Sequence, residues 1–198
     1  MRYRFVCRNA GVRFCLVSWV GFNERICKSL VAAVSVLALL TVSNAGLSAG
    51  PDDFLTRVFD MPPNRKTLWL TPELKSEIAS KLNYQFQQMR VRYWEQGTRS
   101  AWILDEIGKE QPITLGVVID DNRIAALEVL VYRESRGGEI KQAFFTRQFE
   151  GTRLNSEGQD VSLDSAIDGI TGATLSVRAA TKVAKLALFL HAHTHSNG

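Results

Sequence analysis

The sequence has little cysteine and little histidine, and both are confined to the ends of the chain. The three cysteines among its 198 residues are Cys7, Cys15 and Cys27. The rest of the chain therefore offers no thiol for a disulfide framework, a zinc site or a nucleophile. The three histidines all stand in the C-terminal tail, at His191, His193 and His195. Alternate histidines could ligate a metal in an extended tail, but nothing adjacent supplies further ligands and chain ends fray. No Ser-His-Asp arrangement is supported.

Excess charge of one sign is absent from most of the chain. The formal net charge is +4. Residues 1–45 hold six of the 24 basic residues and only one acidic residue, Glu24, so the remainder is close to neutral. Nucleic-acid binding needs clustered positive charge on the folded part, so we expect no nucleic-acid partner. The 45% of apolar residues and 22% of charged residues are typical of a globular protein.

The chain also lacks an apolar run that comfortably crosses a membrane, which takes about 20 residues. Residues 30–42 form an uncharged run between Arg25 and Lys28 on one side and the small residues Ala45 and Ala49 on the other. This order is typical of a secretory signal peptide. An uncleaved N-terminal anchor is the alternative. We therefore expect a periplasmic or otherwise extracytoplasmic protein, with residues 1–49 as signal peptide or anchor.

Patterning in residues 50–112 predicts one helix and one hairpin. Residues 51–64 are polar and indicate a linker or a loosely docked segment. Thr71 and Pro72 are typical of a helix start, and apolar residues then recur at four-residue spacing, at Leu74, Ile78 and Leu82. Residues 89–94 alternate, and a Gly-Thr pair separates them from residues 100–107, which predicts a hairpin.

The remaining residues predict a second hairpin and a closing helix. Residues 113–119 and 123–132 are rich in aliphatic residues and flank the turn-forming Asp120-Asp121-Asn122. Polar loops are expected at 133–139 and 155–160, with a short aromatic piece at 144–149 and a brief extended segment at 161–167. A helix is predicted over 175–191, with one apolar face at Val177, Ala180, Ala184, Ala187, Leu188 and His191. Together these elements predict an α+β fold, a small antiparallel sheet with a C-terminal helix packed on it.

A turn of small residues immediately before that helix carries the candidate chemistry. It runs Asp168-Gly169-Ile170-Thr171-Gly172-Ala173-Thr174-Leu175-Ser176. Glycine lets the backbone approach another group closely, and a helix N-terminus favours an anion. Composition alone favours a plain helix start capped by Thr or Ser.

This turn resembles a known signature. Asp168, Thr171, Gly172, Ala173 and Thr174 match the D-x-x-[ST]-G-A-T pattern of the extracytoplasmic FMN-binding domain. That domain occurs in subunits of the sodium-pumping NADH:quinone reductase and the Rnf complex, and in stand-alone flavoproteins. The order of hairpin, polar loop, aromatic piece and closing helix also agrees, over roughly residues 113–190. The chain departs from the family's Thr-Pro-Gly type loop at residues 134–138, where Glu134 and Arg136 are candidates for flavin contacts and a solvated loop is the alternative.

The resemblance implies a covalent flavin. In the family, FMN is joined by a phosphoester bond to the last Thr of the motif, here Thr174, and a dedicated exported transferase attaches it from FAD with a divalent metal. Asp168, Thr171, Gly172, Ala173, Leu175 and Ser176 would form the cofactor-binding surroundings, with no catalytic or metal-binding residue of their own. Tyr93, Trp94 and Trp102 could stack on the ring, although aromatic residues in strands usually belong to the core.

The sequence therefore predicts an exported electron-transfer flavoprotein, more an electron carrier than a self-sufficient enzyme. Its expected partners are the flavin transferase and a membrane or haem electron-transfer protein. Two alternatives stay open, a non-redox ligand-binding or scaffold module of a membrane complex and a small flavin-dependent reductase. The expected division is 1–49 signal peptide or anchor, 50–112 N-terminal extension, 113–191 FMN-binding domain and 192–198 tail.

Overall fold

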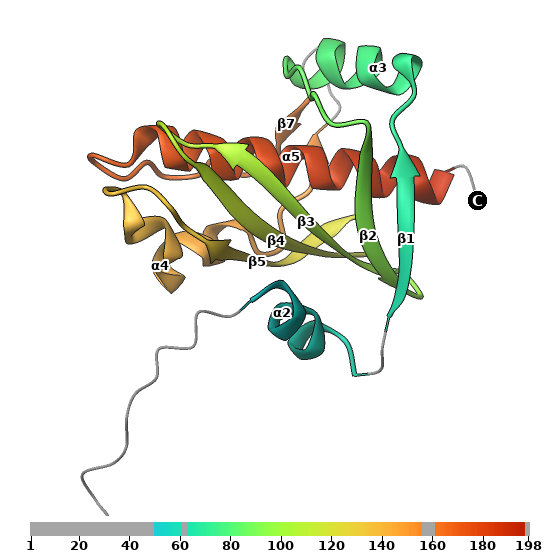
Figure 1. Ribbon diagram of the computed structural model, residues 1–198, viewed down its shortest axis with the longest axis horizontal. Helices are drawn as coiled ribbons and strands as arrows, with labels where there is room; N and C mark the ends of the chain where they lie inside the picture. Colours follow the sequence, from blue (N-terminus) through green and yellow to red (C-terminus); the bar gives the residue numbers. More distant parts are fainter. Residues whose placement is uncertain (1–49, 61–62, 156–160, 197–198) are drawn as a thin grey trace, which may run out of the picture. The chain divides into compact units, whose positions relative to one another are not determined.

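A five-stranded antiparallel sheet with helices on both faces dominates the described part of the chain (Figure 1). The computed structural model describes residues 50–60, 63–155 and 161–196. The segment predicted as signal peptide or anchor, residues 1–49, lies outside the described residues. Among the residues that are described, no helix combines the length and the apolar character needed to cross a membrane. The predicted α+β class is confirmed.

The sheet is a five-stranded meander in the order β1-β2-β3-β4-β5. Its strands are β1 (Asn64–Trp69), β2 (Arg90–Gln96), β3 (Arg99–Ile107), β4 (Pro112–Asp120) and β5 (Arg123–Val131). Both predicted hairpins are confirmed. The β4–β5 turn consists of Asp121 and Asn122, with φ of 49° and 58°, between the paired residues Asp120 and Arg123. Two left-handed residues suit a two-residue hairpin because their twist matches that of the strands.

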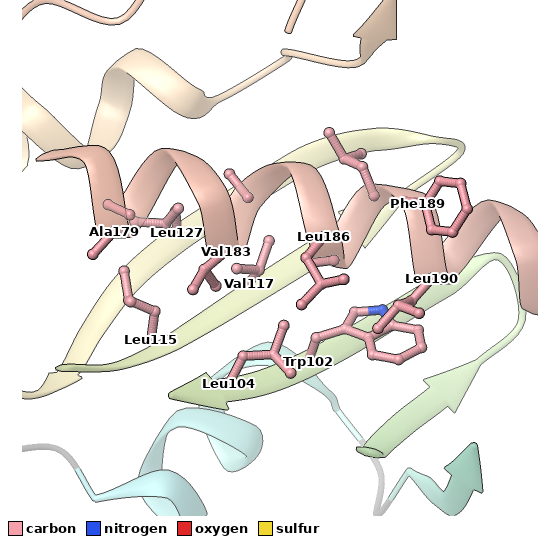
Figure 2. Close-up of a cluster of buried hydrophobic side chains, with 14 of the residues drawn as sticks. Trp102, Leu104, Leu115, Val117, Leu127, Ala179, Val183, Leu186, Phe189 and Leu190 are labelled. Atoms are coloured by element: carbon pink, nitrogen blue, oxygen red, sulfur yellow. The ribbon is translucent and has the colours of Figure 1, made fainter. Parts of the chain in front are cut away.

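Helix α5 (Thr174–Ser196) covers one face of the sheet. Figure 2 shows Val183, Leu186 and Leu190 pointing from α5 toward Trp102 and Leu104 of β3 and toward β4. The apolar face predicted for this helix is buried throughout, from Val177 to His191. The predicted end at His191 is wrong, because the helix continues for five more residues through most of the predicted tail. That tail is therefore helical and not extended.

Helix α3 (Pro72–Leu82) packs on the same side as α5 and was predicted correctly. The Thr71 hydroxyl accepts a hydrogen bond from the Leu74 N–H at 3.3 Å, which makes Thr71 the N-cap. The left-handed Asn83, with φ of 48°, ends the helix. Leu74 and Ile78 are buried in the main core, as the four-residue spacing indicated.

Helix α2 (Pro51–Val58) covers the opposite face and corrects the prediction of a linker over residues 51–64. Its Phe54 and Leu55 are buried against residues of β3, β4 and β5, namely Ala101, Val118 and Leu130. Gly116 on β4 makes room for the Phe54 ring, because a Cβ at that position would lie 2.6 Å from it. Strand β1 was also missed. It is an edge strand with almost all of its residues exposed.

The segment between β5 and α5 consists of short pieces. It contains the 3₁₀ turn η1 (Gly138–Lys141), α4 (Ala143–Thr146), the 3₁₀ turn η2 (Arg147–Phe149) and the small β6 (Leu154–Asn155) and β7 (Ser162–Leu163) pair. The aromatic piece at 144–149 is thus helical. Phe145 and Phe149 are buried edge to face, with ring centroids 5.4 Å apart. These pieces bring the chain back to the start of α5 (Figure 1).

Candidate functional site

The turn before α5 leaves the start of this helix open. Gly172 has a φ of +83°, which suits glycine, and nothing lies within 4 Å of the place a Cβ would take. Ala173 donates to the Ile170 carbonyl at 3.0 Å and accepts from the Val177 N–H at 2.9 Å. Within the described residues, the N–H groups of Thr174 and Leu175 have no such backbone acceptor. Free N–H groups at the start of a 23-residue helix favour an anion there.

The hydroxyl-bearing residues of the turn have different surroundings. Thr171 and Thr174 are exposed, whereas Ser176 is buried at 4% exposure. The Ser176 hydroxyl lies 3.2 Å from the hydroxyl of Tyr132, which donates its own proton to the Arg136 carbonyl. Since a phenol has one proton, Ser176 must be the donor to Tyr132. Ser176 therefore ties α5 to the loop after β5.

A cleft of about 370 Å³ adjoins Thr174. Its walls are the start of α5 (residues 172–176), the β3–β4 turn with Lys109 and Glu110, and residues 134–136 of the loop after β5. A second hollow of about 380 Å³ lies on the other side of the same loop and shares Ser135, Arg136 and Gly172 with the first. Figure 1 shows these segments at one end of the sheet. The volume is in the range of about 300–1,000 Å³ that small-molecule sites occupy.

The charges at the cleft are mostly balanced, with one exception. Lys109 pairs with Glu110 at 3.1 Å. Glu134 accepts hydrogen bonds at one oxygen, Oε1, from the N–H groups of Lys109, Glu110 and Gln111, at 2.5, 2.7 and 3.0 Å. The bonds from Gln111 and Glu110 are the main reason that the pKa of Glu134 is lowered. Arg136 forms no ion pair with any residue that the structure describes, so its guanidinium is available to an anion in the cleft.

Asp168 stands apart from the other motif residues. Its backbone N–H donates to Oε1 of Gln148 at 2.7 Å, and its side chain is exposed. It lines neither the cleft nor the second hollow. The structure thus brings five of the seven predicted cofactor-binding residues to the cleft, as residues 172–176, and Thr171 to the neighbouring hollow. Their role toward a cofactor stays a prediction.

The aromatic and histidine candidates lie elsewhere. Tyr93 and Trp102 stack in the core, with ring centroids 4.5 Å apart, beneath the C-terminal half of α5. His191 is buried and its Nδ1 lies 2.7 Å from the Ser100 hydroxyl. Within the described residues, no group of three His, Cys, Asp or Glu side chains could hold a metal ion. None of these side chains lines the cleft.

Lys109, Glu110 and Tyr132 contribute to the site and were not among the predicted site residues. Lys109 and Glu110 stand 59 and 58 residues before Asp168, the first residue of the motif, and nothing in their local sequence marks them. Tyr132 was predicted only as the end of a strand. In the sequence, Gly108 could have indicated a close approach between segments at this turn. In the structure a Cβ at this position would lie 2.8 Å from Ile113 and 2.9 Å from Glu134.

The donor set of the cleft suits a ligand with an anionic group such as a phosphate, because helix N–H groups and Arg136 can hold an anion beside an open volume. Comparison with protein families agrees with this. Residues 108–188 match the family described as FMN-binding domain. A comparison with curated proteins gave no match. The matched residues include the turn, all walls of the cleft and most of α5, which is consistent with an FMN-binding domain over residues 108–188.

Proposed function

We propose that this chain is an exported electron-transfer flavoprotein that carries FMN on Thr174 through a phosphoester bond. The observation that carries the proposal is the position of Thr174. It is the exposed first residue of α5, it lines the cleft, and it lies within the residues that match the FMN-binding domain. A phosphate ester on its oxygen would lie beside the free N–H groups of the helix start.

The attachment step needs a separate enzyme. The Thr174 oxygen forms a bond to the FMN phosphorus of FAD, the pyrophosphate bond breaks, AMP leaves and the hydroxyl proton is released. Asp168 lines neither hollow, and the two carboxylates that line the cleft are already engaged, Glu110 with Lys109 and Glu134 with three backbone N–H groups. A flavin transferase is therefore the proposed maturation partner, and it would act outside the cytoplasm.

The bound flavin would supply the redox chemistry that no side chain of the cleft can supply. The residues of this chain then bind and orient. Arg136 offers a positive charge at the lip of the cleft, and Gly172 leaves space for the ligand next to Thr174. We propose an electron carrier and not a self-sufficient reductase. A membrane or haem protein is the proposed electron partner.

Substitutions at Thr174 test the attachment. The full chain is produced together with a flavin transferase, denatured, and examined for flavin fluorescence in the gel band. We expect Thr174→Val to lose the fluorescence, because it keeps the β-branched shape without the oxygen, and Thr174→Ser to keep part of it. Thr181→Val is the matched control, since this Thr on the same helix bonds only the Val177 carbonyl, at 2.9 Å.

Two outcomes would contradict the proposal. Covalent fluorescence that survives in Thr174→Val would show that another residue carries the flavin. A folded wild-type protein without any covalent flavin would favour the alternative of a reversible ligand-binding module. Circular dichroism on each variant establishes that the protein is folded.

A further inference from the structure

The β3–β4 turn is held by one carboxylate from a distant part of the chain. Three consecutive N–H groups, those of residues 109–111, point at Oε1 of Glu134, which lies 23 to 25 residues further on. A run of N–H groups that converge in this way is the kind of concavity that binds anions. Here the anion is a side chain of the protein itself. The turn is closed by a further bond from the Gly108 N–H to the Gln111 carbonyl, at 3.1 Å.

The residues around this contact are tightly packed. Gly108 comes so close that a Cβ would lie 2.9 Å from the Glu134 oxygen and 2.8 Å from Ile113. Charged acceptors form stronger hydrogen bonds than neutral ones, and three donors share this acceptor. The turn and the loop after β5 are therefore fixed relative to each other on one side of the cleft.

A second contact fixes the loop on the other side. Tyr132 donates to the Arg136 carbonyl and accepts from Ser176 on α5. Gly137 between them has a φ of +84°, and a Cβ there would lie 2.8 Å from the Tyr132 oxygen and 3.1 Å from Ala173. Residues 134–136 are thus bound to the β3–β4 turn through Glu134 and to the start of α5 through Tyr132.

We propose that Glu134 is a positioning residue for the cofactor. Its Oε1 accepts from three N–H groups of the β3–β4 turn and so fixes this turn as a wall of the cleft that also contains Thr174, so that the ring enters a cleft already formed. The inference rests on the proposed function for the identity of the cofactor. That Glu134 holds the β3–β4 turn in place, which we call the clamp, rests only on the contacts of Glu134. A site whose walls are fixed in advance loses less conformational entropy when it immobilises a ligand.

The first test concerns the clamp and needs no flavin. Hydrogen exchange is measured on the full unloaded chain for peptides that cover residues 108–113. Glu134→Ala should speed exchange of these amides by about tenfold, the change that loss of about 1.4 kcal/mol of protection produces. Glu134→Gln keeps an acceptor oxygen and should lie between. Glu128→Ala is the control, because its carboxylate on β5 pairs with Arg57 at 2.7 Å, away from the cleft. Unchanged exchange in Glu134→Ala would overturn the proposal.

The second test concerns the cofactor. The same variants are produced with a flavin transferase, and the fluorescence anisotropy of the flavin is measured on the folded protein. Glu134→Ala should carry flavin on the same peptide as the wild type, but with lower anisotropy, and Glu134→Gln should restore part of the wild-type value. Equal anisotropy in the wild type and Glu134→Ala would overturn the positioning role, even if exchange had risen.

The two tests separate this inference from the proposed function. A wild-type protein without flavin on Thr174 would refute the proposed function, and the cofactor role of Glu134 with it. The exchange result would still decide whether Glu134 clamps the turn. Should Glu134→Ala fail to fold, Glu134→Gln takes its place, since it preserves the side-chain shape and weakens the hydrogen bonds from the three N–H groups.

Discussion

Thr174 and Ser176 are two residues apart on the same helix, yet their hydroxyl groups have opposite surroundings. Thr174 is exposed at the cleft, while Ser176 is buried and donates to Tyr132. Both oxygens were equally plausible attachment points from composition, and only the family motif distinguished them. The structure adds a physical reason, because an oxygen already used inside the protein is poorly placed for an external transferase.

His191 is a buried titratable residue of α5 that contacts Ser100 of β3. Trp102 Nε1 donates to the Ser100 hydroxyl at 2.8 Å, so Ser100 gives its single proton to His191 Nδ1. Burial, and to a smaller extent the neighbouring His195, lower the pKa of His191 from 6.5 to about 4, while Glu95 and Asp120 act in the opposite direction. A proton on Nδ1 would leave the Ser100 hydroxyl proton without its acceptor.

This arrangement predicts a loss of stability in mild acid. The unfolded chain takes up a proton on His191 below about pH 6.5 and the folded chain only near pH 4, so the free energy of unfolding falls as the pH drops through that window. Urea unfolding should give about 2 kcal/mol less stability at pH 5 than at pH 7 from this residue. His191→Gln should be less stable at pH 7 but should lack this part of the pH dependence. An identical dependence in both proteins would contradict the assignment.

At the scale of elements, the sequence predicted the helices and strands that have a periodic pattern of apolar residues or recognisable turn residues. The two hairpins and α3 and α5 carry clear apolar spacing or turn residues and were found. Strand β1 has only Leu68 partly buried, so an edge strand of this kind has no alternating pattern to detect. Helix α2 did carry a signal, since Pro51 is followed by Asp53, whose carboxylate accepts from the Gly50 N–H at 3.3 Å. The same kind of signal was used at Thr71 and Pro72.

The C-terminal half of α5 should contribute strongly to stability. Leu188 is 2% exposed, and truncating a buried leucine costs about 2–5 kcal/mol, so Leu188→Ala should lower the free energy of unfolding by that amount. Leu175→Ala on the same helix is the matched control, because Leu175 is 44% exposed. Its cost should stay below about 1 kcal/mol. Equal losses in the two variants would mean that the buried face of α5 is misassigned.

At the scale of the whole molecule, the sheet runs across the predicted boundary at residue 112. Strands β1 to β3 precede it and belong to the same sheet as β4 and β5. Strand β4 is buried on both faces, with Leu115 and Val117 toward α5 and Val118 toward α2. The cleft is formed by segments that lie far apart in the sequence. From the sequence alone, only its α5 wall and the candidates Glu134 and Arg136 could therefore be predicted.

The two-sided covering of the sheet predicts that α2 stabilises the fold. Phe54 is 1% exposed and fills the space left by Gly116. Phe54→Ala should therefore cost about 3–5 kcal/mol in urea unfolding. Thr56→Ala on the exposed side of α2 serves as the control and should cost less than about 1 kcal/mol. A small loss in Phe54→Ala would show that α2 is only loosely docked, as its polar sequence first indicated.

The mass of one peptide tests the central claim most directly. Trypsin releases residues 154–178 between Arg153 and Arg178, a peptide that contains Thr171, Thr174 and Ser176. For wild-type protein produced with a flavin transferase, we predict that this peptide is heavier by one FMN less one water, and that its fragments place the added mass on Thr174. An unmodified peptide, or FMN on Thr171 or Ser176, would contradict the account.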